Sequence, residues 1–270
     1  MNESILVIAG SDSIAGAGIQ IDIKTAAAHR VHATTALTAV TAQNTVGVTA
    51  VHPIPAEVIA AQIDAIFDDV RPGAVKIGMV GCREAAKAIA SCLSSHERVP
   101  VVLDPVLVAT AGGSLADDDA TDFLMELLAP LSTVMTPNLP EASALSGIEV
   151  VDDESSLAAA KTLLARGASA VLIKGGHGCK EECIDRLYSS SGEVLTMTNG
   201  RIPGEYHGTG CSLSTAIACN IACGMSIKDA VSAGVDFMHT VLEDASRGRG
   251  ALPATRGTKL IDPLAPSFTR

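Results

Sequence analysis

Residues 5–29 read ILVIAGSDSIAGAGIQIDIKTAAAH, and this order of apolar run, glycine-rich turn and helix decides the fold class. The run Ile5–Ala9 is continuous and bounded by glycine, which is typical of a strand buried on both faces. A turn from Gly10 to Gly18 follows, and the next residues predict a helix toward His29. Such a strand–turn–helix unit is the building block of an α/β domain.

The remaining sequence repeats this alternation. Strands separated by helices of 10–15 residues predict a mostly parallel sheet with helices on both faces, a three-layer α/β fold formed by one domain over residues 1–270. The irregular part is expected after Arg247. Strands are predicted at 34–41, 74–77, 101–103, 133–135 and 170–173, a hairpin at 185–188 and 194–198, and helices at 55–70, 83–93, 117–128, 140–145, 154–166, 211–223 and 226–243.

Composition excludes some classes of protein. Of 270 residues, 47% are hydrophobic, which is enough for a large core without disulfide or metal support. The net charge of −11 argues against a nucleic-acid or anionic-membrane coat, since both need a basic face. No apolar run approaches the length of a membrane helix, and no secretory leader is expected. The seven cysteines are therefore expected to be reduced thiols in the cytoplasm.

The strongest local signal is His207-Gly208-Thr209-Gly210-Cys211-Ser212, which leads directly into an apolar helix. Two glycines allow close approach of the backbone, and the free N–H groups of a helix N-terminus form an anion site suited to a phosphoryl group. Cys211 lies near that terminus, where the pKa of a thiol is typically lowered. The alternative is a tight turn beside a buried cysteine.

Polar residues that follow strands are the next candidates, because ligands of open α/β sheets bind at the carboxyl ends of strands. Asp104 and Lys174 are placed in this way. Asn138 and Glu141 begin a helix and are able to hold Mg²⁺ through water, or else form a capping box.

Two polar residues in apolar surroundings, Asp22 and Gln43, either bind a substrate or satisfy buried groups. Several common sites are absent from the sequence. No Gly-Lys-Ser/Thr follows the first turn, the dinucleotide fingerprint lacks its third glycine, and no Gly-x-Ser-x-Gly occurs. The pair Cys179 and Cys183 is at most half of a zinc site.

Several motifs together resemble the hydroxymethylpyrimidine/phosphomethylpyrimidine kinases of thiamine biosynthesis, which are members of the ribokinase-like superfamily. They run in the family's order over about residues 5–245. They are Ala9-Gly10-Ser11-Asp12, Gly16–Lys24, Thr41–Thr45, Lys76–Met79, Leu103–Val106, Thr136–Glu141, Lys174–His177 and His207–Cys211. The resemblance implies a ribokinase-like fold, ATP and Mg²⁺ as cofactors, a homodimer, and two successive phosphorylations of 4-amino-5-hydroxymethyl-2-methylpyrimidine.

The same resemblance assigns roles to residues. Cys211 would activate the substrate hydroxyl, and Gly208, Thr209 and Gly210 would supply amides to the phosphoryl group. The pyrimidine would contact Gly10, Asp22, Gln43, Met79 and Val106. The nucleotide would meet Asp104, Asn138, Glu141 and Lys174, with Mg²⁺ near Asp104 and Glu141.

Two stretches depart from the family's usual pattern. Ile14-Ala15-Gly16 replaces the usual Ser-Gly-Gly, and His32-Ala33 replaces an aromatic residue followed by glycine. A pyridoxal/pyridoxine kinase of vitamin B6 salvage is the alternative function, because both substrates are heterocycles with a hydroxymethyl group. A non-catalytic binding protein with the same fold is the third hypothesis.

Overall fold

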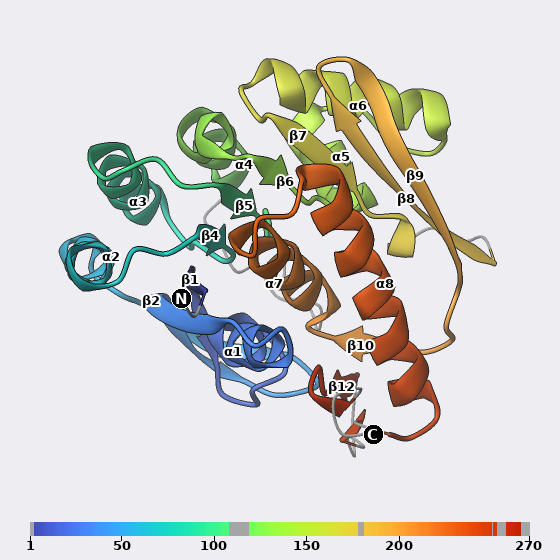
Figure 1. The fold of residues 1–270 in the computed structure, drawn as a ribbon, viewed down its shortest axis with the longest axis horizontal. Coiled ribbons are helices and arrows are strands. Elements are labelled where there is room, and N and C mark those ends of the chain that lie inside the picture. Colours follow the sequence, from blue (N-terminus) through green and yellow to red (C-terminus); the bar gives the residue numbers. More distant parts are fainter. Residues whose placement is uncertain (1–2, 108–118, 178–180, 250, 253–257, 266–270) are drawn as a thin grey trace.

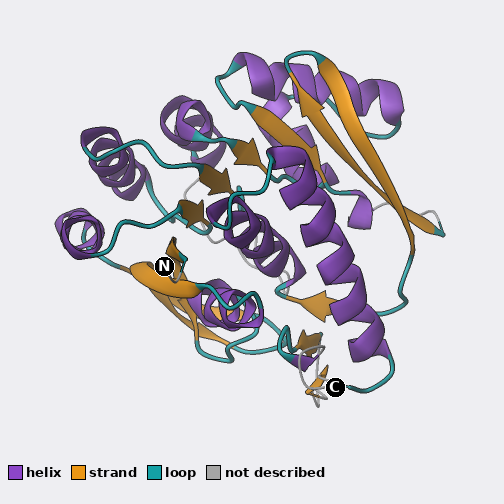
Figure 2. Cartoon of the chain, viewed as in Figure 1, coloured by secondary structure: helices purple, strands orange, loops and turns teal. Residues whose placement is uncertain are grey.

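The computed structural model describes residues 3–107, 119–177, 181–249, 251–252 and 258–265. Its centre is a nine-stranded sheet (Figures 1 and 2). The strands are β1 Ser4–Asp12, β2 His32–Gln43, β3 Val48–Pro53, β4 Ala74–Ile77, β5 Val101–Leu103, β6 Val134–Met135, β7 Ala170–Ile173, β8 Glu182–Ser189 and β9 Gly192–Gly200. Their order in the sheet is β3-β2-β1-β4-β5-β6-β7-β8-β9.

The six central strands, from β2 to β7 in this order, are parallel to one another. The edges are antiparallel, with β3 on β2 at one side and the hairpin β8–β9 beyond β7 at the other. The prediction of a mostly parallel α/β sheet is thereby confirmed, and so is the hairpin. The predicted bounds of β4, β5 and β7 equal those in the structure.

Helices cover both faces of the sheet (Figure 1). One layer contains α1 Gly18–Ala28, α7 Thr209–Ala222 and α8 Ile227–Ser246. The other contains α2 Ala56–Asp69, α3 Arg83–Ser95, α4 Ala120–Phe123, α5 Leu139–Ser146 and α6 Asp153–Ala165. The start of the helix predicted at 117–128 lies outside the described residues, and its described part continues from α4 into a π-helical turn at Leu124–Leu128.

Strand β1 shows why its sequence is continuously apolar. Leu6 and Ile8 pack into the core under α2 and α3, whereas Ile5 and Val7 pack into the core under α1, α7 and α8. All four side chains are fully buried, because successive residues of a strand point to opposite faces and both faces are covered.

A second, three-stranded sheet was not predicted. It is made of β10 Tyr206–His207, β11 Ala251–Leu252 and β12 Lys259–Ile261, in the order β10-β12-β11. The prediction that the tail after Arg247 is irregular is therefore wrong for these segments. Pairing of His207 with Leu260 attaches the tail to the segment that leads into α7.

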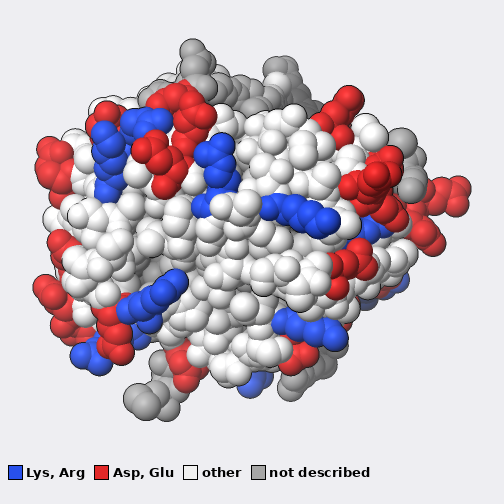
Figure 3. Space-filling view, turned by 90° about the horizontal axis from the view of Figure 1, so that it is seen from above, with Lys and Arg blue, Asp and Glu red and all other residues white. Residues whose placement is uncertain are grey.

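Among the described residues, no helix is long and apolar enough to cross a membrane. The face in Figure 3 carries lysine and arginine side chains interspersed with acidic ones rather than gathered into one basic area.

Candidate active site

One cavity of about 900 Å³ opens at the carboxyl ends of the parallel strands. It lies where the chain turns from β1, β4, β5 and β7 toward the following helices, with α7 and α8 forming another wall. All but one of the predicted site residues line it: Gly10, Gln43, Met79, Val106, Asp104, Asn138, Glu141, Lys174, Gly208, Thr209, Gly210 and Cys211.

The loop before α7 has a backbone that requires glycine at Gly208. This residue is the N-cap of α7 with φ of 82°, and a Cβ there would collide with the carbonyl oxygen of Gly16. At Gly210 a Cβ would lie 3.2 Å from Lys174 Nζ and 3.7 Å from Asp104 Oδ2. The N-terminal amides of α7 therefore lie beside the ammonium group of Lys174. Together, the amides and the ammonium are suited to binding an anion.

The pKa of the Cys211 thiol differs from the expectation. Burial raises the pKa of its thiol to about 12, and the Asp22 and Asp104 carboxylates add to that effect against the opposing ammonium of Lys76. The expectation of a lowered pKa is therefore wrong for this structure. Desolvation at the first turn of α7 outweighs the favourable end of the helix dipole.

Asp22 is the predicted site residue that does not line the cavity. Its Oδ2 pairs with Lys76 Nζ at 2.8 Å, its Oδ1 accepts a hydrogen bond from Thr215 Oγ1 at 2.8 Å, and both charged side chains are 0% exposed. The prediction that Asp22 contacts the substrate is therefore wrong for this structure, because the ion pair with Lys76 holds its carboxylate beneath α7. Asp22 thus satisfies a buried group, the other reading that its sequence context allowed.

Lys76 was missed as a functional candidate, because one lysine in the strand Ala74–Ile77 reads as a surface residue. Burial by itself lowers the pKa of its ammonium, but Asp22, Cys211 and Asp104 outweigh burial and raise that pKa above its ordinary value. A permanent positive charge therefore lies under the start of α7. The available signal was Asp22 itself, an unexplained acid in an apolar helix.

Lys174 lies between two carboxylates. Its Nζ is 3.0 Å from Asp104 Oδ1 and 4.0 Å from Glu141 Oε2. Burial tends to raise the pKa of Asp104, but Lys174 and Lys76 outweigh it and hold that pKa below its ordinary value. Burial raises the pKa of Glu141 to about 7, with Lys174 opposing the shift and Asp104 adding to it. An arriving phosphate would compete with both acids for the ammonium.

Asn138 and Glu141 form a reciprocal capping box at the start of α5. Asn138 Oδ1 accepts the Glu141 N–H at 2.9 Å, and Glu141 Oε2 accepts the Asn138 N–H at 2.8 Å. The structural alternative is thus present, yet both side chains also line the cavity. Capping fixes the carboxylate where a ligand can meet it.

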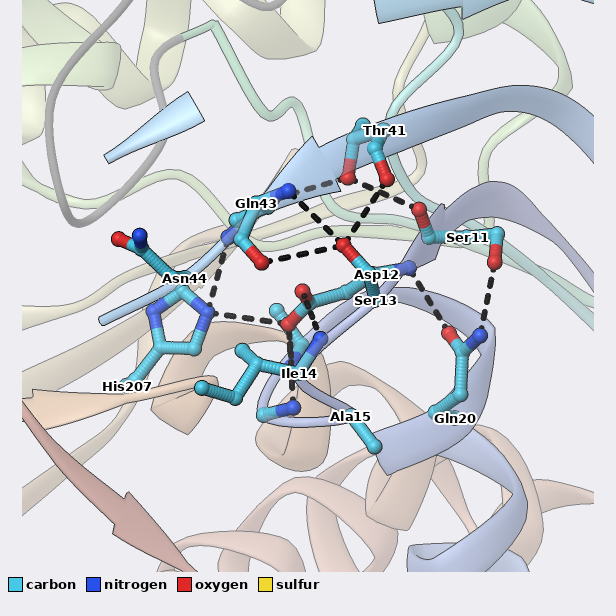
Figure 4. A network of polar contacts seen from close by, with 12 residues as sticks. Ser11, Asp12, Ser13, Ile14, Ala15, Gln20, Thr41, Gln43, Asn44 and His207 are labelled. Atoms are coloured by element: carbon cyan, nitrogen blue, oxygen red, sulfur yellow. Dashed lines mark hydrogen bonds and ion pairs between the residues drawn. The ribbon is translucent and has the colours of Figure 1, made fainter. Parts of the chain in front are cut away.

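A network of hydrogen bonds holds the turn after β1 (Figure 4). The Asp12 carboxylate accepts backbone N–H groups of Ile14, Gly16 and Ala17 at 2.8–3.0 Å. His207 Nε2 lies 3.2 Å from Asp12 Oδ2 and 3.0 Å from the amide nitrogen of Gln43. Asp12 and His207 were not predicted as site residues, although both occur in the quoted motifs.

The donor set decides which metal ion these residues could hold. Among the described residues, no group of three or more histidine, cysteine or acidic side chains is arranged for a metal ion, and Cys179 lies outside them. Asp104 and Glu141 are the two carboxylates beside Lys174. This set fits Mg²⁺ held mainly by phosphate oxygens and water, because that ion usually takes only one or two carboxylates from a protein.

Comparison with known proteins places this site in a family. The family model for phosphomethylpyrimidine kinase matches residues 12–255. The hydroxymethylpyrimidine/phosphomethylpyrimidine kinase of Rhizobium meliloti (strain 1021) is 46% identical over 257 residues, which cover 93% of this chain and 96% of the relative.

Solved structures agree with this likeness. Phosphomethylpyrimidine kinase from Clostridium difficile 630 superposes with a TM-score of 0.78 at 36% identity, over 88% of this chain and 99% of that one. Pyridoxal kinase from Staphylococcus aureus in complex with ADP superposes with a TM-score of 0.89 at 28% identity, over 100% and 96%. By its sequence and by its fold, the chain belongs to the phosphomethylpyrimidine kinase family.

Proposed function

We propose that the protein transfers the γ-phosphoryl group of ATP to the hydroxymethyl oxygen of 4-amino-5-hydroxymethyl-2-methylpyrimidine, and then a second one to the resulting monophosphate. The observation that carries this proposal is a cavity shared by both sets of predicted residues. Gly10, Gln43 and Met79 line the same cavity as Lys174 and the Gly208–Cys211 loop. The family's relatives carry the name of this activity, and the S. aureus pyridoxal kinase binds ADP.

The loop and the ammonium of Lys174 act on the transferred group. Phosphoryl transfer needs little covalent chemistry from a protein, and catalysis is mostly positioning and stabilisation of charge. The amides at the start of α7 donate hydrogen bonds to the equatorial oxygens. Lys174 exchanges part of its ion pair with Asp104 for a contact with the phosphate. Glu141 and Asp104 would hold Mg²⁺, which would neutralise part of the phosphate charge.

Cys211 orients the acceptor hydroxyl. With its pKa near 12, the thiol keeps its own proton in the ligand-free protein at neutral pH. It then serves first as a hydrogen-bonding partner of the hydroxyl. A thiol that keeps its proton cannot take up the hydroxyl proton as well, so Cys211 acts as a base only in the small fraction that is ionised, which the Lys76 ammonium increases by opposing the raised pKa.

Product analysis tests the proposed function. Purified protein is given ATP and Mg²⁺ with the hydroxymethylpyrimidine, its monophosphate or pyridoxal, and products are identified by mass. We expect mono- and then diphosphate from the pyrimidine. Phosphorylation of pyridoxal alone would overturn the proposal and favour vitamin B6 salvage.

Two variants test the assigned roles. Lys174→Met should lower kcat by about 10²-fold, the size expected for loss of one group that stabilises transition-state charge.

Glu141→Gln should raise the Mg²⁺ concentration needed for half-maximal rate by about tenfold, within the range seen when metal-supporting groups are removed. An unchanged Mg²⁺ requirement would remove Glu141 from the metal site.

We also propose a cytoplasmic homodimer. The six described cysteines are free thiols, in keeping with a reducing compartment. The apolar composition and the family resemblance favour self-association, and the edge hairpin of β2 and β3 exposes Val40 and Val51. Light scattering after gel filtration should give twice the chain mass of 27.5 kDa, and a monomer mass would contradict the proposal.

A further inference from the structure

His207 lies at the meeting point of three segments that are far apart in sequence (Figure 4). Its side chain is 1% exposed and contacts Asp12, 3% exposed, through Nε2. The same nitrogen lies 3.0 Å from the amide of Gln43, which lines the cavity. A Cβ on Gly16 would collide with Cδ2 of the imidazole, so the ring packs directly on the turn after β1.

The surroundings of the ring determine which nitrogen carries the proton. Burial tends to raise the pKa of Asp12, but His207 and the N–H groups of Ile14 and Ala17 outweigh it and lower that pKa. The ionised carboxylate only accepts hydrogen bonds, so Nε2 must donate to it. Nδ1 is buried without a partner among the described residues. An acceptor in that position costs less than an N–H would, because buried N–H groups without partners are the rarer case.

A proton on Nε2 in turn determines the orientation of the Gln43 amide. A nitrogen that donates cannot accept a hydrogen bond from the amide NH₂, and an NH₂ group at 3.0 Å would set two donors against each other. The amide oxygen therefore faces His207 and shares the one Nε2 proton with Asp12, turned end for end from the arrangement in Figure 4. The NH₂ group then faces Thr41 Oγ1, which lies 3.3 Å from the amide. Thr41 already donates its hydroxyl proton to the carbonyl oxygen of Ser11 at 3.0 Å, and its oxygen is therefore able to accept.

We propose that His207 is a positioning residue that fixes the donor and acceptor sides of the Gln43 amide and thereby selects a 4-aminopyrimidine. After its contacts with His207 and Thr41, the amide retains one oxygen lone pair and one N–H. These match an exocyclic amino group and a ring nitrogen, the same pairing that glutamine makes with adenine. A 4-oxo pyrimidine with N–H in the ring presents the opposite order and is rejected by a fixed amide. This inference rests on the proposed function.

Substrate selectivity tests the proposal. The ratio of kcat/KM for the 4-amino substrate to that for 5-hydroxymethyl-2-methylpyrimidin-4-one is measured in wild type, His207→Leu and His207→Gln. Leucine removes the donor, so the amide can turn and the ratio should fall about tenfold or more, the effect of one hydrogen bond. Glutamine places an NH₂ group near the position of Nε2 and should restore most of the ratio.

A histidine outside the cavity is the matched control. His29, at the end of α1, contacts Phe237 and the carbonyl oxygen of Thr25. His29→Leu should lower stability without changing the selectivity ratio. Equal loss of both activities in His207→Leu, with an unchanged ratio, would show a purely structural role and overturn the proposal.

Nitrogen NMR of the wild-type protein gives a test that needs no variant. Protein labelled with ¹⁵N-histidine should show one imidazole with a slowly exchanging proton on Nε2, absent from His207→Gln spectra. A proton on Nδ1 would overturn the proposal. The two levels fail separately: a wild type that phosphorylates no pyrimidine refutes the proposed function, whereas an active wild type with the wrong tautomer refutes only this inference.

Discussion

At the scale of single residues, burial decides the chemistry of Cys211 more strongly than its position in a helix. A thiol at a helix N-terminus ordinarily ionises more readily. Here burial, with the Asp22 and Asp104 carboxylates adding to its effect, raises the pKa of the thiol to about 12. Sequence reasoning located the residue and its loop but could not know its burial, because burial depends on how α7 packs on β1, β4 and β5.

Alkylation measures this difference directly. Because only the thiolate reacts, Cys211 should be alkylated slowly at pH 7, and its rate should rise with pH until the pKa near 12 is approached. Exposed Cys223 should react first. Peptide mapping by mass spectrometry after timed iodoacetamide treatment checks the order, and fast modification of Cys211 at pH 7 would contradict the raised pKa.

Ala15 is a second residue at which the sequence indicated an unusual backbone conformation. It replaces the family's usual glycine and has φ of 57°, where a side chain is strained. Ala15→Gly should stabilise the protein by about 0.5–1 kcal/mol, the relief of left-handed strain less the added freedom of the unfolded chain. Urea unfolding measures the difference.

The neighbouring alanine gives the control for that substitution. Ala17 has φ of −141°, which any residue adopts. Ala17→Gly therefore relieves no strain, and because Ala17 is the N-cap of α1, where glycine is tolerated better than alanine, we expect a change of only a few tenths of a kcal/mol. If both glycine variants lose stability alike, Ala15 carries no strain that matters.

At the scale of elements, prediction succeeded where a segment is defined by its own residues. Strands β4, β5 and β7 are short apolar runs between polar boundaries, and their ends agree with the structure. Strand β3 has mostly exposed residues and no such run. The short strands β10 and β12 exist through pairing with distant segments: they pair with each other across about fifty positions of sequence, and β12 also pairs with β11.

Helix α5 combines a structural and a chemical role in one side chain. Glu141→Gln keeps an oxygen able to accept the Asn138 N–H but removes the charge. Because the carboxyl pKa is raised to about 7 in the folded state, its contribution to stability is present below about pH 4.5 and is lost as pH rises toward 7. Without Mg²⁺, the free energy of unfolding of Glu141→Gln should therefore rise relative to that of wild type by on the order of 2 kcal/mol between pH 5 and pH 8.

A second capping box controls for the helix end. In α6, Asp152 accepts the N–H of Ser155 while the Ser155 hydroxyl oxygen accepts that of Asp152. Ser155→Ala should cost about 0.5–1 kcal/mol at both pH values. Denaturant unfolding at pH 5 and pH 8 compares the variants, and a pH-independent difference between Glu141→Gln and wild type would refute the raised pKa.

At the scale of the whole molecule, parallel strands explain why distant motifs meet. Their carboxyl ends share one edge of the sheet, so residues after β1, β4, β5 and β7 reach the same cavity. Nearly all of the residues predicted from the sequence therefore line the cavity. Sequence order could not predict which polar residues turn inward beneath α7, because that depends on side-chain pairs such as Asp22 with Lys76, formed across 54 positions of the chain.

The cavity shared by the two sets of predicted residues also predicts the kinetic order of the reaction. Its volume of about 900 Å³ lies near the upper end of the range for ligand pockets, and the loop Gly208–Cys211 is part of the wall of the same space as Gln43 and Lys174. Both substrates should therefore bind together, with direct transfer and no phosphorylated protein. Initial rates over a grid of ATP and pyrimidine concentrations should give intersecting double-reciprocal lines. Parallel lines, or radioactivity retained on the protein after incubation with γ-labelled ATP alone, would show a covalent intermediate, and Cys211 would then be a nucleophile rather than a partner of the substrate hydroxyl.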